Sequence, residues 1–361
     1  MKTIKVAIAD DSSFMRKALQ RILEKEPFIK IAGLAASGEE LLEKIPVWKP
    51  DVITLDISMP GIDGLETLDR IMQKNPLPVI IISTHSGKDA PLTLEALNKG
   101  AVDFIDKQQY SLVDFEGIRS ALVQKILDAA GAKISPQALQ HDEESVSRKQ
   151  TKKSKLVVEP LHSPTKIKVI AIGASTGGPP AVQRLLESLD NIVDIPILVV
   201  QHMPIGFTKA FAERLNSNLS FKVVEAKHGE EIENGTVYIA PSGFHLKTHQ
   251  ESDSVRLALA SYPDLQHKPS VDILFESMAP VYGKRALAVL LTGMGKDGAE
   301  GMLALKKAGA FTISEDEKSC VVYGMPRAAK LCGAVSEEIP LCRIGDRIVE
   351  LINDRGEDCK R

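Results

Sequence analysis

Residues 168–178 read KVIAIGASTGG, and this stretch takes an apolar strand directly into a glycine-rich turn. Pro179 and Pro180 follow at once, where proline favours the first turn of a helix. A serine on such a strand-to-helix turn exposes its hydroxyl at the carboxyl end of a sheet, and the flanking glycines let a substrate carbonyl approach the backbone. Ser175 is therefore a candidate nucleophile, although such turns also bind phosphate or merely connect a strand to a helix.

Two further segments favour the catalytic interpretation. Residues 199–204 (VVQHMP) place His202 after an apolar strand, and residues 289–298 (VLLTGMGKDG) place Asp297 after another. The carboxyl ends of parallel strands lie along one edge, so the three side chains can converge. In a triad, Ser175 would attack an acyl carbon, His202 would take and return the proton, and Asp297 would orient the imidazole. The order Ser, His, Asp differs from that of α/β-hydrolases, so the match to G-x-S-x-G does not assign that fold.

Composition limits the class of protein. The chain has 361 residues, 43% of them hydrophobic, which is enough for about two globular domains. A net charge of −3 gives no reason to expect nucleic-acid binding. The N-terminal segment reads as a strand followed by acidic residues rather than a signal peptide, and no apolar run approaches the roughly 20 residues of a membrane span. We therefore expect a cytoplasmic protein that neither binds nucleic acid nor inserts into a membrane.

The pattern of apolar runs predicts an α/β protein of two domains and a linker. In residues 1–131, five strands alternate with amphipathic helices, which predicts a doubly wound, flavodoxin-like (βα)5 sheet. Residues 132–165 are polar, with a mostly basic run, and read as a tether rather than a basic binding patch. In residues 166–361 the alternation resumes, interrupted by a hairpin at 245–261, and predicts a mostly parallel, Rossmann-like α/β sandwich. The predicted strands are 4–9, 29–34, 52–55, 79–82 and 102–105 in the first domain, and 169–172, 195–200, 237–239, 288–291 and 311–313 in the second.

Polar residues follow four of the first five strands. Asp10 and Asp11 follow the first strand, Asp56 the third, Ser83 the fourth and Lys107 the fifth. Clustered carboxylates can hold Mg²⁺ through oxygen ligands, and one of them could accept a phosphoryl group whose oxygens contact the lysine and the serine. Helix caps and solvated loops would explain any one of these positions, but the five together favour a phosphoryl site.

With these residues, the first 130 positions resemble a response-regulator receiver domain. The resemblance implies that a histidine kinase is the phosphodonor for Asp56, and that Ser83 and Phe104 relay the change to one face. The implied metal ligands are Asp10, Asp11, Asp56 and the carbonyl of Ser58. Gln108 follows Lys107 where receivers usually carry proline.

The second domain resembles the catalytic domain of the chemotaxis protein-glutamate methylesterases. The segments that carry the resemblance are GASTGG at 173–178, QHMP at 201–204, PSVD at 269–272 and TGMGKDG at 292–298. That family hydrolyses methyl esters of glutamate on methyl-accepting chemotaxis receptors and deamidates receptor glutamines, both by acyl transfer through a serine and with no cofactor for the esterase reaction.

Carried over to this chain, the resemblance implies the roles of Ser175, His202 and Asp297 given above, with the backbone N–H of Met294 as an oxyanion donor. Thr176 and His267 would line the substrate groove, although a structural surface histidine explains His267 equally well. An intact receiver ahead of an intact triad predicts that the unphosphorylated receiver covers the groove and that phosphorylation releases it.

Two alternatives remain. A receiver can be joined to a DNA-binding output domain, but that domain would be compact and basic with a helix-turn-helix, whereas this one is about 200 residues of α/β pattern. A serine hydrolase of another substrate class, acting on small esters, is distinguished only by the family resemblance.

Overall fold

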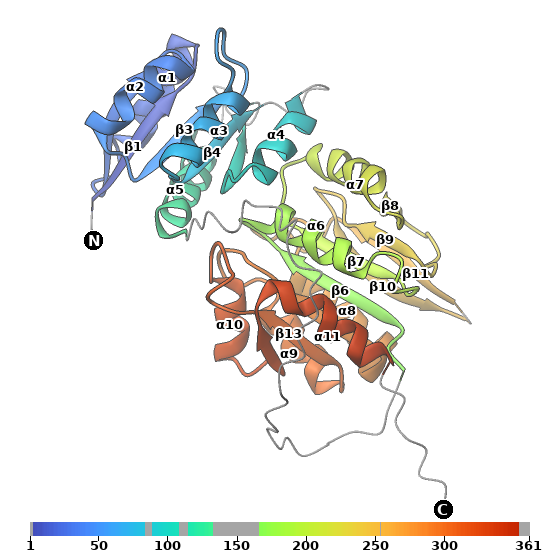
Figure 1. Cartoon of the computed structure of the whole chain (residues 1–361). Coiled ribbons are helices and arrows are strands. Elements are labelled where there is room, and N and C mark those ends of the chain that lie inside the picture. The colour runs from blue at the N-terminus through green and yellow to red at the C-terminus, as the bar shows by residue number, and fades with distance from the viewer. Residues whose placement is uncertain (1–2, 84–88, 108–114, 133–165, 253, 354–361) are drawn as a thin grey trace, which may run out of the picture.

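A computed structural model of the chain describes residues 3–83, 89–107, 115–132, 166–252 and 254–353. They form two parallel sheets with helices on both faces, which confirms the predicted α/β class (Figure 1). Gln108 and nearly all of the predicted linker lie outside the described residues. No helix in the described ranges is long and apolar enough to cross a membrane.

The N-terminal unit, which we call the receiver unit, has five strands in the order β2-β1-β3-β4-β5, and every neighbouring pair is parallel. The strands are β1 Ile4–Ala9, β2 Ile29–Ala35, β3 Val52–Asp56, β4 Val79–Ser83 and β5 Asp103–Asp106. The helices are α1 Ser13–Leu23, α2 Gly38–Trp48, α3 Gly64–Lys74, α4 Asp89–Asn98 and α5 Phe115–Gly131. Helices α1 and α5 bury apolar side chains on one face of the sheet, and α2, α3 and α4 cover the other.

The C-terminal unit, which we call the catalytic unit, has a seven-stranded parallel sheet in the order β14-β13-β12-β6-β7-β9-β8. Its strands are β6 Val169–Ala174, β7 Ile197–Gln201, β8 Lys222–Glu225, β9 Thr236–Ile239, β12 Ala286–Leu290, β13 Phe311–Glu315 and β14 Glu337–Ile339. The apolar pattern did not predict the two edge strands, β8 and β14. Both are short and half polar, KVVE and EEI, so neither carries the apolar run by which buried strands are found.

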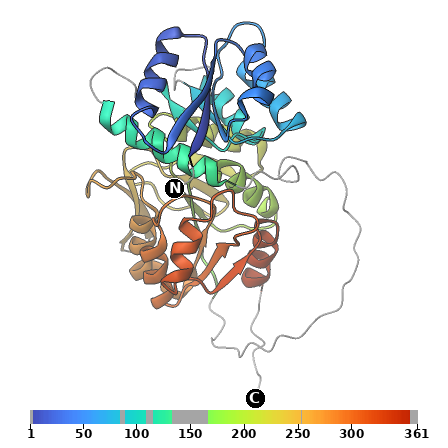
Figure 2. The same ribbon diagram turned by 90° about the vertical axis from the view of Figure 1, so that its left-hand side faces the viewer.

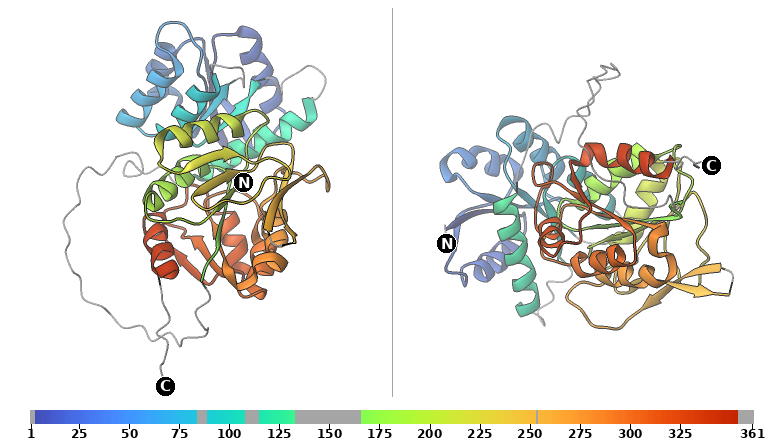
Figure 3. Two further views of the ribbon diagram at one scale, coloured as in Figure 1. Left: turned by 90° about the vertical axis from the view of Figure 1, so that its right-hand side faces the viewer. Right: turned by 90° about the horizontal axis from the view of Figure 1, so that it is seen from below.

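Helices cover both faces of the seven-stranded sheet. The first face carries α6 Gly178–Leu189, α7 Phe207–Asn218 and α11 Leu341–Asn353. The second carries α8 Val271–Tyr282, α9 Ala299–Lys307 and α10 Met325–Leu331. The hairpin of β10 His245–Glu251 and β11 Ser254–Ala260 is antiparallel, close to the predicted bounds, and projects on the side away from the receiver unit (Figure 3).

The chain enters this sheet at β6, builds outward on one side through β7, and later returns to the other side through β12. The strand order therefore reverses beside β6, which is where open α/β sheets bind their ligands, outside the carboxyl ends of the strands. The carboxyl ends of β12, β6 and β7 are adjacent there. These ends carry the three predicted triad residues.

The two units share one apolar core. Helix α4 of the receiver unit packs against α6 and α7 of the catalytic unit (Figure 1). Figure 2 shows the receiver unit lying on the catalytic unit, with α5 along the boundary. At the centre of this contact, Phe104 of β5 meets Phe207 of α7 with ring centroids 4.5 Å apart, and both side chains are buried. The face of the receiver unit that carries the fourth helix and fifth strand is thus the face in contact with the catalytic unit.

Candidate active site

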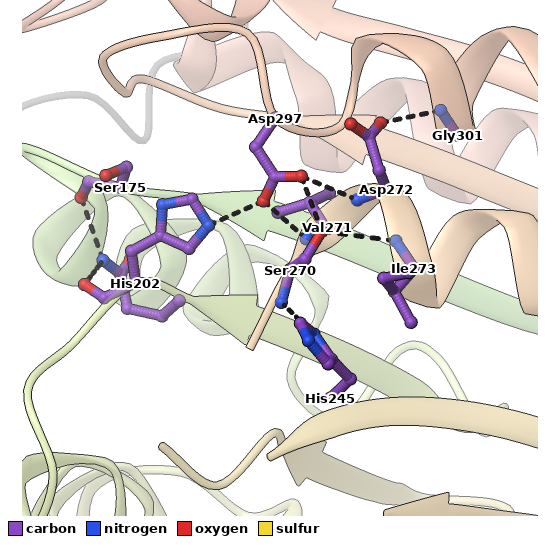
Figure 4. A network of polar contacts seen from close by, with 10 residues as sticks. Ser175, His202, His245, Ser270, Val271, Asp272, Ile273, Asp297 and Gly301 are labelled. Atoms are coloured by element: carbon purple, nitrogen blue, oxygen red, sulfur yellow. Dashed lines mark hydrogen bonds and ion pairs between the residues drawn. The ribbon is translucent and has the colours of Figure 1, made fainter. Parts of the chain in front are cut away.

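Ser175 and His202 stand side by side because their strands are paired in register. Ala174 of β6 pairs with Gln201 of β7, so the next residues leave the sheet together, and the His202 amide donates to the Ala174 carbonyl at 3.0 Å. The Gln201 side chain then ties both together, with Nε2 donating to the carbonyls of Ser175 (2.9 Å) and His202 (3.1 Å). The close view shows the serine and the imidazole next to each other (Figure 4).

Asp297 lies on the other side of the imidazole. Its Oδ2 is 2.8 Å from Nε2 of His202, and it comes from the loop between β12 and α9. Nδ1 of His202 is buried and has no hydrogen-bond partner among the described residues. Because Nε2 bonds to the carboxylate, Nδ1 is the ring nitrogen left to act on a serine, and it lies on the side of the ring toward Ser175 (Figure 4).

The Asp297 carboxylate sits on the N-terminus of α8. The amide of Val271 donates to Oδ2 at 2.7 Å, and the amide of Asp272 and the hydroxyl of Ser270 donate to Oδ1 at 3.0 and 2.7 Å. Burial alone would raise the pKa of Asp297, but the bonds from His202 and these donors outweigh it and hold the pKa well below its usual range. The positive end of the helix favours the same charged state. Asp297 is thus fixed as an anion facing the imidazole.

The loop after β12 presses against the serine. The Ser175 amide donates to the Thr292 carbonyl at 3.0 Å. A Cβ on Gly293 would come within 2.8 Å of the Ser175 Cβ and would also overlap Met325, so only glycine fits this approach. The Gly293 amide is already used by the Val322 carbonyl at 3.0 Å, which leaves Met294 as the next amide in the loop.

His267 stacks on His202, with ring centroids 4.2 Å apart and the planes within 8° of parallel. Burial lowers the pKa of His267 to about 4, and the neighbouring His202 and Lys125 contribute in the same direction. The side chain is half-buried. The His267 ring therefore stays neutral near pH 7 and packs against the face of the His202 imidazole.

The receiver unit reaches this site through Thr176, the residue after the candidate nucleophile. Its Oγ1 donates to Oδ2 of Asp103 at 2.7 Å, and both side chains are buried. Asp103 also pairs with Lys125 of α5 at 2.7 Å. The next amide, of Gly177, donates to the Val102 carbonyl at 3.2 Å; its φ of +74° suits glycine. Thr176 therefore lies under the receiver unit rather than open to solvent.

Acidic side chains cluster at the carboxyl edge of the five-stranded sheet. One carboxylate oxygen from each of Asp10, Asp11 and Asp56 lies within 4.8 Å of the others. Lys107 Nζ is 2.5 Å from Oδ2 of Asp56 and 3.3 Å from Oδ2 of Asp10. Oδ2 of Asp10 is buried and has no hydrogen-bond partner within the described ranges. Burial raises the pKa of Asp10 and of Asp56. Three carboxylates, one with a buried oxygen that is available as a ligand, suit a hard cation such as Mg²⁺, which prefers oxygen ligands. The amide of Ser58, whose carbonyl was the fourth predicted ligand, donates to Oδ1 of Asp56 at 3.1 Å.

Ser83 lies at the same strand edge as the acidic cluster, and Phe104 lies in the contact with the catalytic unit. Ser83 ends β4 and its Oγ accepts a 2.6 Å hydrogen bond from Oγ1 of Thr93 in α4. Phe104, in the neighbouring strand, is only 2% exposed and contacts Phe207. A movement of Ser83 toward Asp56 would therefore disturb the helix that packs on the catalytic unit.

Two parts of the site were not predicted. Ser270 stands in the quoted PSVD segment, where a serine ahead of an apolar helical run is a helix-cap signal that could have revealed its place beneath Asp297. Gln201 directly precedes His202, but an amide at a strand end has no distinctive pattern.

Two families match the chain: the family described as response regulator receiver domain over residues 6–114, and the one described as CheB methylesterase over residues 170–348. A protein-glutamate methylesterase/protein-glutamine glutaminase of Halalkalibacterium halodurans is 42% identical over 99% of each chain. A second such protein, from Syntrophus aciditrophicus, is 44% identical over 98% of this chain and all of its own. The crystal structure of the Thermotoga maritima CheB methylesterase catalytic domain matches 52% of this chain and all of its own, at 39% identity and a TM-score of 0.50.

Proposed function

The chain belongs to the CheB methylesterase family, in the form that carries a response regulator receiver domain, and on that premise we propose the reaction and the residues that perform it. It is a protein-glutamate methylesterase and protein-glutamine glutaminase, a hydrolase that serves chemotactic adaptation and is regulated by phosphorylation. Its proposed substrates are methyl-accepting receptors, and it acts in the cytoplasm with a chemotaxis histidine kinase as phosphodonor. Its domains are a receiver at 1–131, a linker at 132–165 and the catalytic domain at 166–361.

One observation carries the assignment of the site: His202 stands between Ser175 and the anchored carboxylate of Asp297 at three adjacent strand ends. Ser175 Oγ attacks the side-chain carbonyl carbon of the methylated glutamate while Nδ1 of His202 takes its proton. The tetrahedral intermediate collapses, the proton passes to the leaving oxygen, and methanol departs. Water then attacks the acyl-enzyme with His202 again as base, which frees the glutamate carboxylate and Ser175. With glutamine the leaving group is ammonia.

The loop of residues 292–295 supplies the oxyanion donor. The Gly293 amide is engaged by Val322, so we assign the donor to the amide of Met294, as the family resemblance does. Asp297 does not take the proton; it orients the ring and stabilises the imidazolium. We propose that His267 holds the imidazole flat by stacking and that Thr176 borders the groove once the receiver unit no longer holds its hydroxyl.

The receiver unit controls this site. Asp56 is the proposed phosphorylation site, with Lys107 and Ser83 as contacts of the phosphoryl oxygens. Asp10, Asp11, Asp56 and the Ser58 carbonyl would hold Mg²⁺, which neutralises charge on the incoming group when bound. When Ser83 turns toward the phosphoryl group, it gives up the hydrogen bond from Thr93 of α4. The packing of α4 and of Phe104 in β5 against α7 then weakens.

The test is methanol release from receptor-bearing membranes that carry radiolabelled methyl groups. Ser175→Ala should lower the rate by about 10⁴- to 10⁶-fold while circular dichroism and the unfolding midpoint stay unchanged. A folded Ser175→Ala protein that keeps more than about a tenth of the activity would exclude Ser175 as nucleophile. Parallel assays with small acyl esters test the substrate class: hydrolysis of those esters without release from receptors would contradict a receptor substrate.

A further inference from the structure

Glu315 is a buried acid that the reaction described above does not use. It is the last residue of β13, and none of its surface is exposed. Its Oε2 accepts a 2.8 Å hydrogen bond from the amide of Thr292, while Oε1 has no hydrogen-bond partner among the described residues. No basic side chain in the described part of the chain forms an ion pair with it. Thr292 donates the one hydrogen bond to this carboxyl that meets hydrogen-bond geometry within the described residues. A buried carboxyl with so few bonds costs stability, which suggests that it has a functional role.

Thr292 is the residue through which Glu315 reaches the nucleophile. The Thr292 carbonyl accepts the Ser175 amide at 3.0 Å. Its hydroxyl donates to the Thr176 carbonyl at 3.0 Å and accepts the Val322 amide at 2.9 Å. One residue thus fixes the backbone on both sides of Ser175, and its own amide is fixed by Glu315.

The surroundings of Glu315 favour the neutral acid. Burial raises its pKa to about 7, and the negative charge of Asp316 adds to that effect, against the Thr292 amide and the nearby Ser319 and Cys320 side chains. A neutral carboxyl still accepts the Thr292 amide through its carbonyl oxygen. An ionised one would place an unpaired negative charge directly behind the loop that must stabilise a developing oxyanion.

We propose that Glu315 is a positioning residue for Ser175 and for the oxyanion loop, acting through the amide of Thr292. This role rests on the proposed serine chemistry but not on the identity of the substrate. Glu315 touches no reacting atom; it sets the angle at which Ser175 leaves β6 and holds the loop that carries Met294 against it. Its protonated form is the active one, because only that form adds no charge opposed to the oxyanion.

The test compares three variants of the full-length protein. Glu315→Leu keeps the volume but removes the acceptor, so the Thr292 amide is left unpaired. Glu315→Gln keeps an acceptor of the same shape that never ionises. The control is Ser314→Ala, which changes the preceding buried residue of β13, where the hydroxyl has no hydrogen-bond partner among the described residues. Each variant is first checked by its urea-unfolding midpoint.

The first readout is the rate at which a fluorophosphonate modifies Ser175, measured by intact-protein mass spectrometry from pH 5.5 to 9. The second is kcat and KM for methanol release. Fluoride leaves as Ser175 Oγ bonds to phosphorus and His202 takes the proton, so the probe reports serine reactivity without a receptor. We expect Glu315→Leu to react about 10- to 100-fold more slowly, with kcat reduced and KM unchanged, as for a lost buried hydrogen bond. Ser314→Ala should stay within about twofold of wild type, because its hydroxyl has no hydrogen-bond partner among the described residues and the Glu315 carboxyl remains in place.

The pH profile distinguishes a positioning role of Glu315 in catalysis from a role in folding stability alone. The wild-type rate should fall above pH 7 as Glu315 ionises, whereas Glu315→Gln should match wild type at pH 6 and keep its rate at pH 8.5. Identical alkaline limbs for wild type and Glu315→Gln, or a folded Glu315→Leu protein with wild-type reactivity, would overturn the proposal. If Glu315→Leu does not fold, the Glu315→Gln profile decides. Failure of the wild type to be modified at Ser175 would instead refute the proposed serine hydrolase, and modification without methanol release would refute only its substrate.

Discussion

Oδ2 of Asp103, in the last strand of the receiver unit, accepts a 2.7 Å hydrogen bond from Oγ1 of Thr176, the residue that follows Ser175. A carboxylate of one unit is thus bonded one residue away from the proposed nucleophile of the other. Asp103 is held in turn by Lys125, whose charge also acts on His267. The contact between the units and the reacting groups are therefore parts of one polar network.

Removing this carboxylate should activate the unphosphorylated enzyme. In Asp103→Ala the hydroxyl of Thr176 loses its acceptor and Lys125 its partner, so the two units separate more readily. A coupling free energy of about 1–3 kcal/mol corresponds to a basal rate roughly 5- to 150-fold higher. The control is Glu43→Ala, which removes an exposed ion pair with Lys44 in α2, away from the contact with the catalytic unit, and should leave the basal methanol release unchanged. Equal basal rates for both variants would show that the Asp103 contact does not restrain the enzyme.

Chelation of divalent metal should remove regulation but not hydrolysis. The carboxylate cluster of Asp10, Asp11 and Asp56 lies in the receiver unit, while the proposed triad uses only side chains of the catalytic unit. With EDTA present, a small-molecule phosphodonor should no longer stimulate methanol release, and the basal rate should persist. Added Mg²⁺ should restore the stimulation. A basal rate that falls with EDTA and recovers with Mg²⁺ would contradict the assignment of the metal to the receiver unit.

His267 should act by stacking and not by proton transfer. Its pKa, lowered to about 4 by burial, keeps the ring neutral above pH 5. His267→Ala should lower kcat by roughly 3- to 10-fold, the scale of a stacked pair, and His267→Phe should recover most of it. The acid limb of the pH–rate profile should be the same in all three proteins, because a neutral His267 carries no proton that moves in the reaction. A limb that shifts in His267→Phe would assign His267 a role in proton transfer.

Glu315 should make the catalytic unit less stable as pH rises. Its pKa is about 7 when folded against an ordinary value of 4.5, so the folded chain keeps a proton that the unfolded chain releases between these values. The free energy of unfolding therefore falls from pH 4.5 to 7 and levels off above, by on the order of 3 kcal/mol. Glu315→Gln lacks this dependence, so urea unfolding should show its advantage over wild type growing from pH 5 to pH 8. The exposed Glu317→Gln variant serves as control, and an advantage that does not change with pH would be the contrary result.

The strand ends were predictable because apolar runs mark buried strands and the next residues must emerge at one edge. Ser175, His202 and Asp297 could be named on that basis, and so could Asp10, Asp11, Asp56, Ser83 and Lys107. The sequence could not show which ring nitrogen of His202 bonds to Asp297, because that depends on the path of the loop after β7. In the folded chain it is Nε2. The anchoring of Asp297 on α8 was within reach, since Ser270 precedes an apolar helical run.

Contacts between the two units leave no periodic signal in the sequence. Asp103 reads as one more residue of a buried strand, and nothing near it indicates that its partner is Thr176. Glu315 was hidden for a related reason: the run SEDEKS at 314–319 looks like a polar turn, whereas the strand continues through Glu315 and buries it. His267 lies in a loop without periodicity, so its stacking on His202 could be seen only in the folded chain.

The central claim is that the phosphoryl site of the first sheet controls the serine site of the second. The most direct measurement is the ratio of methanol-release rates with and without a phosphodonor and Mg²⁺, for the full-length protein, for Asp56→Ala and for a protein beginning near Pro164. We predict a ratio of roughly 5 to 150 for the full-length protein, the range of common allosteric couplings. Asp56→Ala should keep the basal rate with a ratio of one, and the shortened protein should be fast without a phosphodonor. A shortened protein no faster than the unphosphorylated full-length enzyme would contradict the claim.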